Sequence, residues 1–181
     1  KGPAVYRRAQ WPMPAKPPVN MTLAQSDAVP PGIGLEQPQG FIGGGMTVTV
    51  HPRNLGGGYQ GLDRADLFVL YIVRDAFPAR PLFFSRTDGS YPEELGFTNH
   101  IVNVGLARKL VQQPPVASDS LLNLPGSGWL DLATTYALWT QSFDGIQSLS
   151  AKQRWLDKPS IGIPYMYVRT GYDLAQALQG K

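Results

Sequence analysis

The sequence predicts a mixed α+β fold: a small sheet packed with three or four helices, plus an extended proline-rich N-terminal arm. The 20 glycines and 17 prolines among 181 residues disfavour a coiled coil or a helical bundle. One segment alternates as a strand does, and three others have the caps or the periodicity of helices. We divide the chain into an arm, residues 1–45, and a compact domain, residues 46–181.

The arm is rich in both proline and large apolar residues. Proline fixes φ and removes a backbone donor, so we expect neither helix nor central strand there. A disordered leader is one interpretation. We prefer an ordered, extended arm that lies on another surface, of this chain or of a partner, because its apolar residues are too many for a solvated linker. With one residue from a later connection, the interface candidates are Tyr6, Trp11, Met13, Met21, Phe41 and Trp155.

The first part of the domain predicts a strand, a helix and a second strand. Residues 46–50 alternate and are β-branched, which is typical of a strand. Asp63 and Asp66 can cap a helix over 63–76, although its seven-residue apolar run also fits a buried strand. Residues 81–86 follow a proline and predict a strand. If the three segments form one unit, the crossover is parallel and right-handed.

The remaining elements are predicted from turns and from helical spacing. Residues 87–90 predict a turn, and 106–111 a second strand or a short amphipathic element. A helix over 129–142 aligns Leu132, Tyr136 and Trp139. A helix over 165–179 aligns a second stripe: Tyr165, Val168, Tyr172, Ala175 and Leu178. We expect one shared core that contains Leu67, Leu70, Val73, Phe83 and Trp139.

The chain offers little recognisable catalytic chemistry. It has no cysteine and only two histidines, His51 and His100, in no hydrolase or metal motif. Glu93 and Glu94 follow a proline and predict the first turn of a helix. The glycine runs at 43–45 and 56–58 lack a phosphate-loop signature. We therefore predict no catalytic residue, no cofactor and no metal.

Net charge and hydropathy limit the kinds of partner that the sequence predicts. The net charge of +3 is too small to demand nucleic acid, and none is predicted. The longest apolar run, residues 67–73, is far shorter than the roughly 20 residues that span a bilayer. We predict no transmembrane helix of its own. The many aromatic residues fit a carbohydrate or lipid site, but such residues are more often core and interface anchors.

Two segments carry a family resemblance. Residues 64–75 are followed by Ala-Arg-Pro-Leu-Phe-Phe-Ser at 79–85, and Leu95-Gly96 leads into Gly-Leu-Ala-Arg-Lys-Leu-Val at 105–111. These resemble the C-terminal soluble region of a bacterial family of uncharacterised multi-spanning membrane proteins, similar to protein O-mannosyltransferases. The resemblance covers about residues 62–112, and residues 157–165 extend it. Such transferases keep their catalytic acid between transmembrane helices, so no catalytic residue carries over to this chain.

The resemblance implies an extracytoplasmic (in bacteria, periplasmic) domain that lies against a membrane protein. We expect a non-catalytic accessory subunit that docks on and stabilises a membrane complex, such as a respiratory or photosynthetic one, with peripheral membrane contact. The alternative is an acceptor- or glycan-binding portion of a lipid-phosphosugar-dependent glycosyltransferase.

Overall fold

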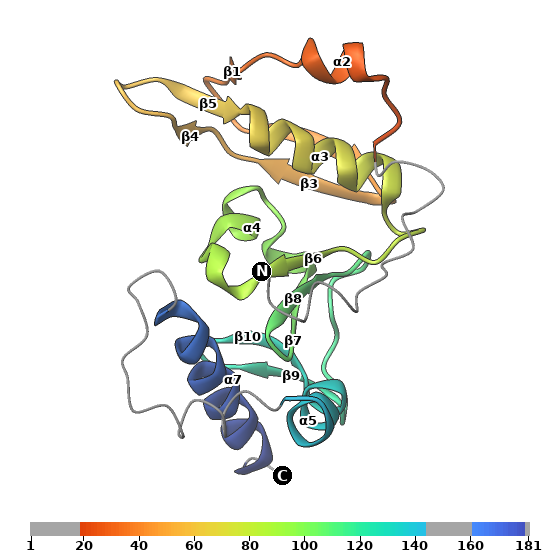
Figure 1. Ribbon diagram of the computed structural model, residues 1–181, viewed down its shortest axis with the longest axis vertical. Coiled ribbons are helices and arrows are strands. Elements are labelled where there is room, and N and C mark those ends of the chain that lie inside the picture. Colours follow the sequence, from red (N-terminus) through yellow and green to blue (C-terminus); the bar gives the residue numbers. More distant parts are fainter. Residues whose placement is uncertain (1–18, 144–160, 180–181) are drawn as a thin grey trace, which may run out of the picture.

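The computed structural model describes residues 19–143 and 161–179. Over those residues the chain forms three sheets and three main helices, so the predicted mixed α+β class is confirmed. Figure 1 shows two parts stacked along the long axis of the molecule, with residues 19–76 in the upper part and the larger sheet below.

The upper part contains two small sheets. β1 (Gly32–Gly34), β5 (Gln60–Asp63) and β4 (Arg53–Asn54) form a three-stranded antiparallel sheet in that order. β2 (Gln39–Gly43) and β3 (Met46–Val50) form an antiparallel hairpin. Both sheets contact the helix that follows β5.

β3 confirms the strand predicted over 46–50. Met46, Val48 and Val50 are buried and the threonines between them are exposed, as alternation requires. Gly44 and Gly45 make its two-residue turn with φ of 59° and 73°, a conformation that hairpin turns of this kind need and glycine adopts readily.

α3 (Arg64–Ala76) confirms the predicted capped helix and excludes the buried-strand alternative. The Asp66 amide donates to Asp63 Oδ1 at 2.9 Å, and the Asp63 amide donates to Asp66 Oδ2 at 3.0 Å. Its buried face includes Leu67, Leu70 and Val73, three of the predicted core residues.

The expectation of an arm without regular structure is wrong for part of residues 19–45. α2 (Leu23–Asp27) is a short helix, closed by a capping box between Thr22 and Gln25. It fits between Pro18 and Pro30, where no proline interrupts the backbone. β1 and β2 then pair with β5 and β3, so the boundary expected at residue 45 runs between paired strands.

The lower part is built on a five-stranded sheet in the order β6-β8-β7-β10-β9. Only the β7–β10 pair is parallel. The strands are β6 (Phe83–Ser85), β7 (Ile101–Val104), β8 (Ala107–Leu110), β9 (Leu121–Leu124) and β10 (Gly128–Asp131). Three short helical turns, η1 (Arg86–Asp88), α4 (Tyr91–Glu94) and η2 (Thr98–His100), lie between β6 and β7.

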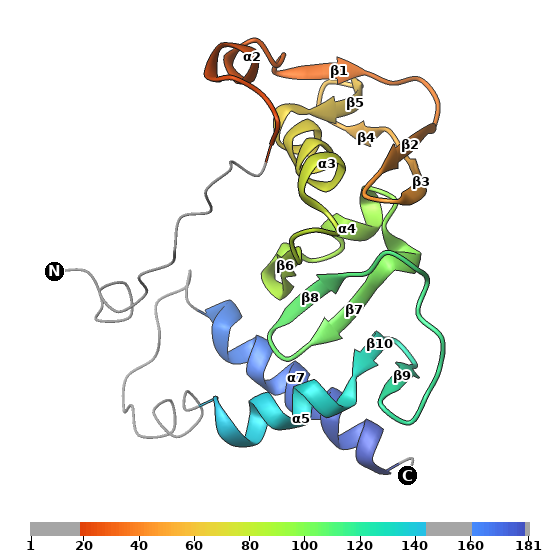
Figure 2. The same ribbon diagram turned by 90° about the vertical axis from the view of Figure 1, so that its right-hand side faces the viewer.

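Two helices cover one end of this sheet. α5 (Leu132–Gln141) and α7 (Gly162–Gln179) lie side by side in both views (Figure 2). A Cβ atom built on Gly171 would lie 3.0 Å from the Trp139 ring, so α5 packs tightly against α7 at a position where α7 has no side chain. The helix predicted over 129–142 corresponds to α5, which begins at Leu132, three residues after the predicted start, because residues 128–131 form β10.

The three segments do not form the strand-helix-strand unit on which the right-handed crossover was conditional. β3 pairs with β2 in the hairpin, whereas β6 pairs with β8 in the five-stranded sheet. The two strands therefore belong to different sheets, and α3 connects the upper part to the lower one.

The single predicted core is also wrong in two residues. Leu67, Leu70 and Val73 belong to one buried cluster, while Trp139 packs against a second one around Leu130 and Leu174. Phe83 is 53% exposed. β6 is an edge strand, and its alternation turns Phe84 towards Tyr91 and Phe97, which leaves Phe83 on the opposite, solvent side.

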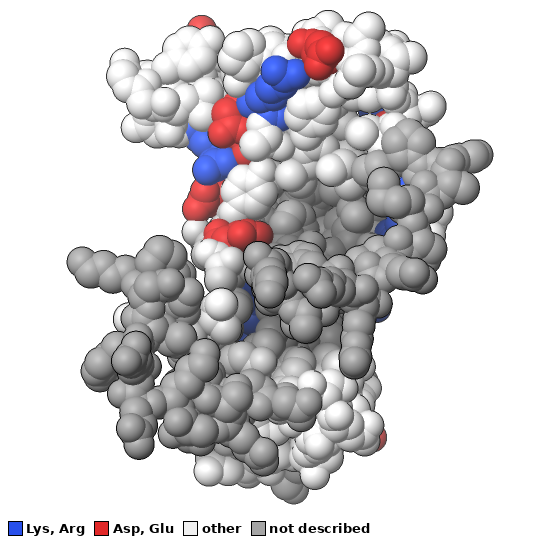
Figure 3. All heavy atoms as spheres, in the orientation of Figure 1, with Lys and Arg blue, Asp and Glu red and all other residues white. Residues whose placement is uncertain are grey.

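A partly buried ion pair in the upper part contacts α4 through its arginine. Asp66 is fully buried, and Arg53 Nη1 lies 2.5 Å from Asp66 Oδ1 while its guanidinium stacks 5.1 Å from the centre of the Tyr91 ring. Burial and then the Asp66 carboxylate raise the pKa of Tyr91 above its usual range. On the face shown in Figure 3, acidic and basic side chains are interspersed along the upper part rather than gathered by sign.

Candidate functional site

A polar cleft lies in the lower part, where α7 meets the five-stranded sheet. Its volume is about 490 Å³, within the range of small-molecule sites. The described residues that line it include three arginines from three elements, Arg86 of η1, Arg108 of β8 and Arg169 of α7. They include one carboxylate, that of Glu93. The turn at residues 126–128 and the ring of Tyr165 complete the wall.

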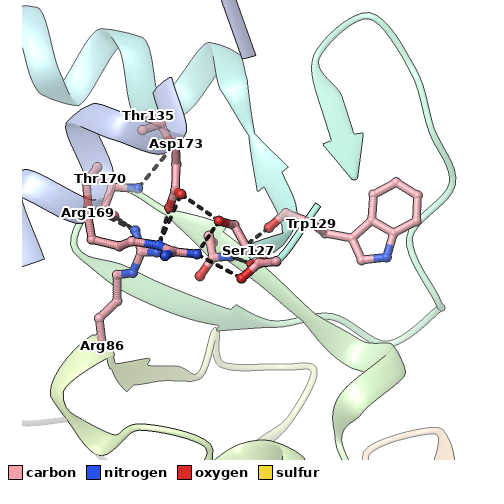
Figure 4. A network of polar contacts seen from close by, with 10 residues as sticks. Arg86, Ser127, Trp129, Thr135, Arg169, Thr170 and Asp173 are labelled. Atoms are coloured by element: carbon pink, nitrogen blue, oxygen red, sulfur yellow. Dashed lines mark hydrogen bonds and ion pairs between the residues drawn. The ribbon is translucent and has the colours of Figure 1, made fainter. Parts of the chain in front are cut away.

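Asp173 organises one side of the cleft. It is fully buried on α7 and accepts hydrogen bonds from Arg86 Nη2 at 2.8 Å and from Ser127 Oγ at 2.7 Å. Arg169 Nε forms an ion pair with the same carboxylate at 3.2 Å. Figure 4 shows these side chains turned towards its carboxylate. Arg169 also donates to the Ser127 hydroxyl and to the Gly126 carbonyl. A buried carboxylate needs such partners, because an unpaired charge out of water is costly.

Two threonines extend the network to the β7–β8 turn. Arg86 Nη1 donates to Thr170 Oγ1 at 2.9 Å, and that hydroxyl donates to the Gly105 carbonyl at 3.1 Å. The Gly105 amide donates to Thr135 Oγ1 of α5 at 3.0 Å. The network thus fixes α5 and α7 against the turn of the sheet.

Arg108 and Glu93 form the opposite side. Arg108 pairs with Glu93 and donates to the Gly89 carbonyl at 2.5 Å. Burial and the neighbouring Arg86 guanidinium lower the pKa of Arg108, against the opposing effect of Asp88. Glu93 Oε2 is buried and has no hydrogen-bond partner among the described residues. This side of the cleft therefore contains Arg108, which lies near the second cation Arg86, and an oxygen of Glu93 that lacks a hydrogen-bond donor among the described residues.

Trp129 contributes to the cleft wall without stacking on the arginines. Its carbonyl accepts from Asn103 Nδ2 at 3.0 Å, and the same amide donates to the Ser127 carbonyl at 2.8 Å. The indole points away from Asp173 (Figure 4). The indole of Trp129 therefore does not form a stacking surface for a sugar ring beside the arginines.

The two histidines lie at a second hollow of about 360 Å³, which Glu93 also borders. His100 is buried and its Nδ1 lies 3.0 Å from the Val111 carbonyl, while His51 is exposed at the end of β3. Glu93 and Glu94 lie in the first turn of α4, as predicted. Among the described residues, no group of three histidine, cysteine or acidic side chains is placed to hold a metal ion.

The other prominent surface is the exposed side of α7, which we call the α7 face: Tyr165, Val168, Tyr172, Ala175 and Leu178. This is the stripe that the sequence aligns, and all five residues are exposed, with 67%, 70% and 62% for the first three. The buried side instead consists of Thr170, Asp173, Leu174 and Ala177.

The interface candidates fall into two groups. Tyr6, Trp11, Met13 and Trp155 lie outside the described residues. Met21 and Phe41 are half-buried and pack against the larger hydrophobic cluster.

Sequence reasoning missed Arg86, Ser127, Arg169 and Asp173 as a group. The available signal was the pair Arg169 and Asp173, oppositely charged and four residues apart on one helix. No local signal joins Arg86 to Asp173, which are 87 residues apart.

Comparisons with known proteins give no assignment: no family model, no curated protein and no solved structure matches this chain. In the described part of the chain, no helix has the length and hydropathy needed to span a membrane.

Proposed function

We propose that this chain is a non-catalytic extracytoplasmic accessory subunit that docks on a membrane protein complex and stabilises it. The observation that carries the proposal is the α7 face. Val168 and Tyr172, two large side chains of the 18-residue helix α7, have most of their surface exposed to solvent. Contiguous exposed apolar surface on a folded domain typically marks a contact with another molecule.

The spacing of the α7 face supports a helical partner. Tyr165, Val168, Tyr172 and Ala175 follow one another at intervals of three, four and three residues, which is the spacing of a seam between two helices. The charged residues of α7, Arg169 and Asp173, engage the polar network instead of this seam. Helices of a membrane complex that extend beyond the bilayer would offer the complementary surface.

A non-catalytic role is supported by the surroundings of Ser127. In the described structure its hydroxyl contacts Asp173 and Arg169, and both residues of that pair also bind other groups. A nucleophilic serine needs an adjacent base that is free to accept its proton. The histidines lie at the other hollow, beside Thr49 and Gly96.

The membrane location of the partner rests on the family resemblance. Its segments fall on α3, on β6 and on β8, and the last two pair directly with each other. The alternative, an acceptor- or glycan-binding portion of a glycosyltransferase, is favoured by the cleft. A gene that encodes membrane spans contiguous with this chain would favour the transferase.

Co-purification from native membranes tests the docking proposal. The protein carrying an affinity tag should recover membrane partners in fixed stoichiometry, and Val168→Asp should lose them because a charge enters the apolar seam. The matched control is Ile42→Asp, since Ile42 on β2 is a similarly exposed aliphatic residue at 77%. If both variants are folded by circular dichroism and both retain the partners, the α7 face is not the docking surface.

A further inference from the structure

The cleft has an excess of positive charge. Arg86 and Arg169 share the carboxylate of Asp173, and Arg108 pairs with Glu93, so three guanidinium groups meet two carboxylates there. The carboxylate of Asp88 also attracts the charge of Arg108, but Asp88 is exposed, so solvent screens this interaction. The same carboxylate takes part in the cap of η1. One cationic charge is therefore left without an equally buried counterion.

Arg169 is the arginine best placed to meet a ligand. Its side chain is 35% exposed, compared with 9% for Arg86 and 13% for Arg108. The Asp173 carboxylate that it contacts keeps its shorter contact with Arg86, so Arg169 can turn towards the cleft without leaving Asp173 unpaired. Guanidinium groups bind phosphate and carboxylate oxygens through paired hydrogen bonds.

The opposite wall of the cleft, formed by Arg108 and Glu93, contains an acceptor without a hydrogen-bond donor in the described structure. Glu93 Oε2 is buried and unpartnered among the described residues, and an unmet buried acceptor is costly. An anion alone would be repelled by this carboxylate. A ligand that also carries hydroxyl groups would satisfy Glu93 with a hydroxyl and the arginines with its anionic group.

We propose that the cleft between α7, the 126–128 turn and β8 binds a small hydroxylated organic anion, with Arg169 contacting its phosphate or carboxylate and Glu93 accepting from a hydroxyl. The volume of about 490 Å³ suits a molecule of monosaccharide size. This binding does not depend on the docking role of the α7 face, although Tyr165 borders both surfaces.

Calorimetric titration of the 181-residue chain at low salt tests the proposal with four probes: glucose 6-phosphate, glucuronate, glucose and inorganic phosphate. Saturable binding of glucose 6-phosphate or glucuronate is expected, and the better of the two identifies the anionic group. Glucose and inorganic phosphate should each bind at least about tenfold more weakly, because each lacks one of the two features. Equal affinity for either of them, or no saturation by any probe up to roughly 20 mM, would overturn the proposal.

Two further measurements locate the binding. Arg169→Gln should weaken it by about tenfold or more, while Arg74→Gln, a matched exposed arginine that pairs with Asp75, should leave it unchanged. In the unmodified protein, amide NMR signals of residues 126–128 should shift on titration, and those of the 56–58 loop should not. Unchanged affinity of Arg169→Gln, or shifts confined to other regions, would contradict the assignment.

Discussion

Asp173 is a buried carboxylate that joins several elements of the lower part of the molecule. Its carboxylate is fully buried and neutralises Arg86, itself only 9% exposed, at 2.8 Å. The pair joins α7 to η1 across 87 residues of sequence. A buried ion pair adds little over an apolar pair, but removing one partner leaves an uncompensated buried charge.

Asp173→Asn should therefore lower the free energy of unfolding by about 3 to 5 kcal/mol, because the amide keeps the shape but not the charge. Urea denaturation measures this loss. Glu36→Gln, at an exposed carboxylate, should change stability by less than about 0.5 kcal/mol. A loss below about 1 kcal/mol for Asp173→Asn would show that Arg86 is not held by this carboxylate.

Tyr91 predicts how stability changes in alkali. Its pKa is raised in the folded protein by burial and by the Asp66 carboxylate, whereas an unfolded tyrosine ionises near pH 10. Above about pH 10 the folded state therefore binds more protons than the unfolded state, so this contribution is full below pH 10 and declines as the pH rises. Tyr91→Phe should make the alkaline decline of stability less steep than in the unmodified protein. Urea midpoints between about pH 9 and 11 measure it, with Tyr59→Phe as control, and an unchanged steepness contradicts the assignment.

At the scale of elements, local patterns predicted conformation well and orientation poorly. α3 and β3 were predictable, because the Asp63 and Asp66 caps and the Met46–Val50 alternation are local signals. α2 was missed because its Thr22 cap lies among prolines. The buried side of α7 could not be predicted, since hydropathy marks the aromatic side while Asp173 is buried by a distant arginine.

The orientation of β6 can be tested by comparing the stability lost on truncating a buried and an exposed phenylalanine. Phe97 is fully buried beside Phe84, while Phe83 is 53% exposed. Phe97→Ala should destabilise the protein by about 3 to 5 kcal/mol, because it leaves a cavity in the larger hydrophobic cluster. Phe83→Ala should cost less than about 1 kcal/mol by the same chemical denaturation. Equal losses would mean that β6 is shifted by one residue and presents its other side to the core.

At the scale of the whole molecule, the fold class was predictable but the assembly of the site was not. Glycine and proline content and the alternation of strand and helix patterns suffice for a mixed α+β class. The cleft requires η1, β8, the 126–128 turn and α7 to meet, and such long-range pairing leaves no trace at any one position. The α7 face was visible in the sequence as a stripe, and only the structure places it in solvent.

The docking role of the α7 face is the central claim, and site-specific photo-crosslinking in intact cells tests it most directly. A photoreactive phenylalanine analogue replaces Val168 in one sample and Ile42 in another. Both are exposed aliphatic residues, Val168 on α7 in the lower part and Ile42 on β2 in the upper part. The account predicts that the Val168 position crosslinks to a defined membrane protein, identified by mass spectrometry, and that the Ile42 position does not. Crosslinks to that protein from Ile42 but not from Val168, or none from Val168 in a folded protein, would contradict it.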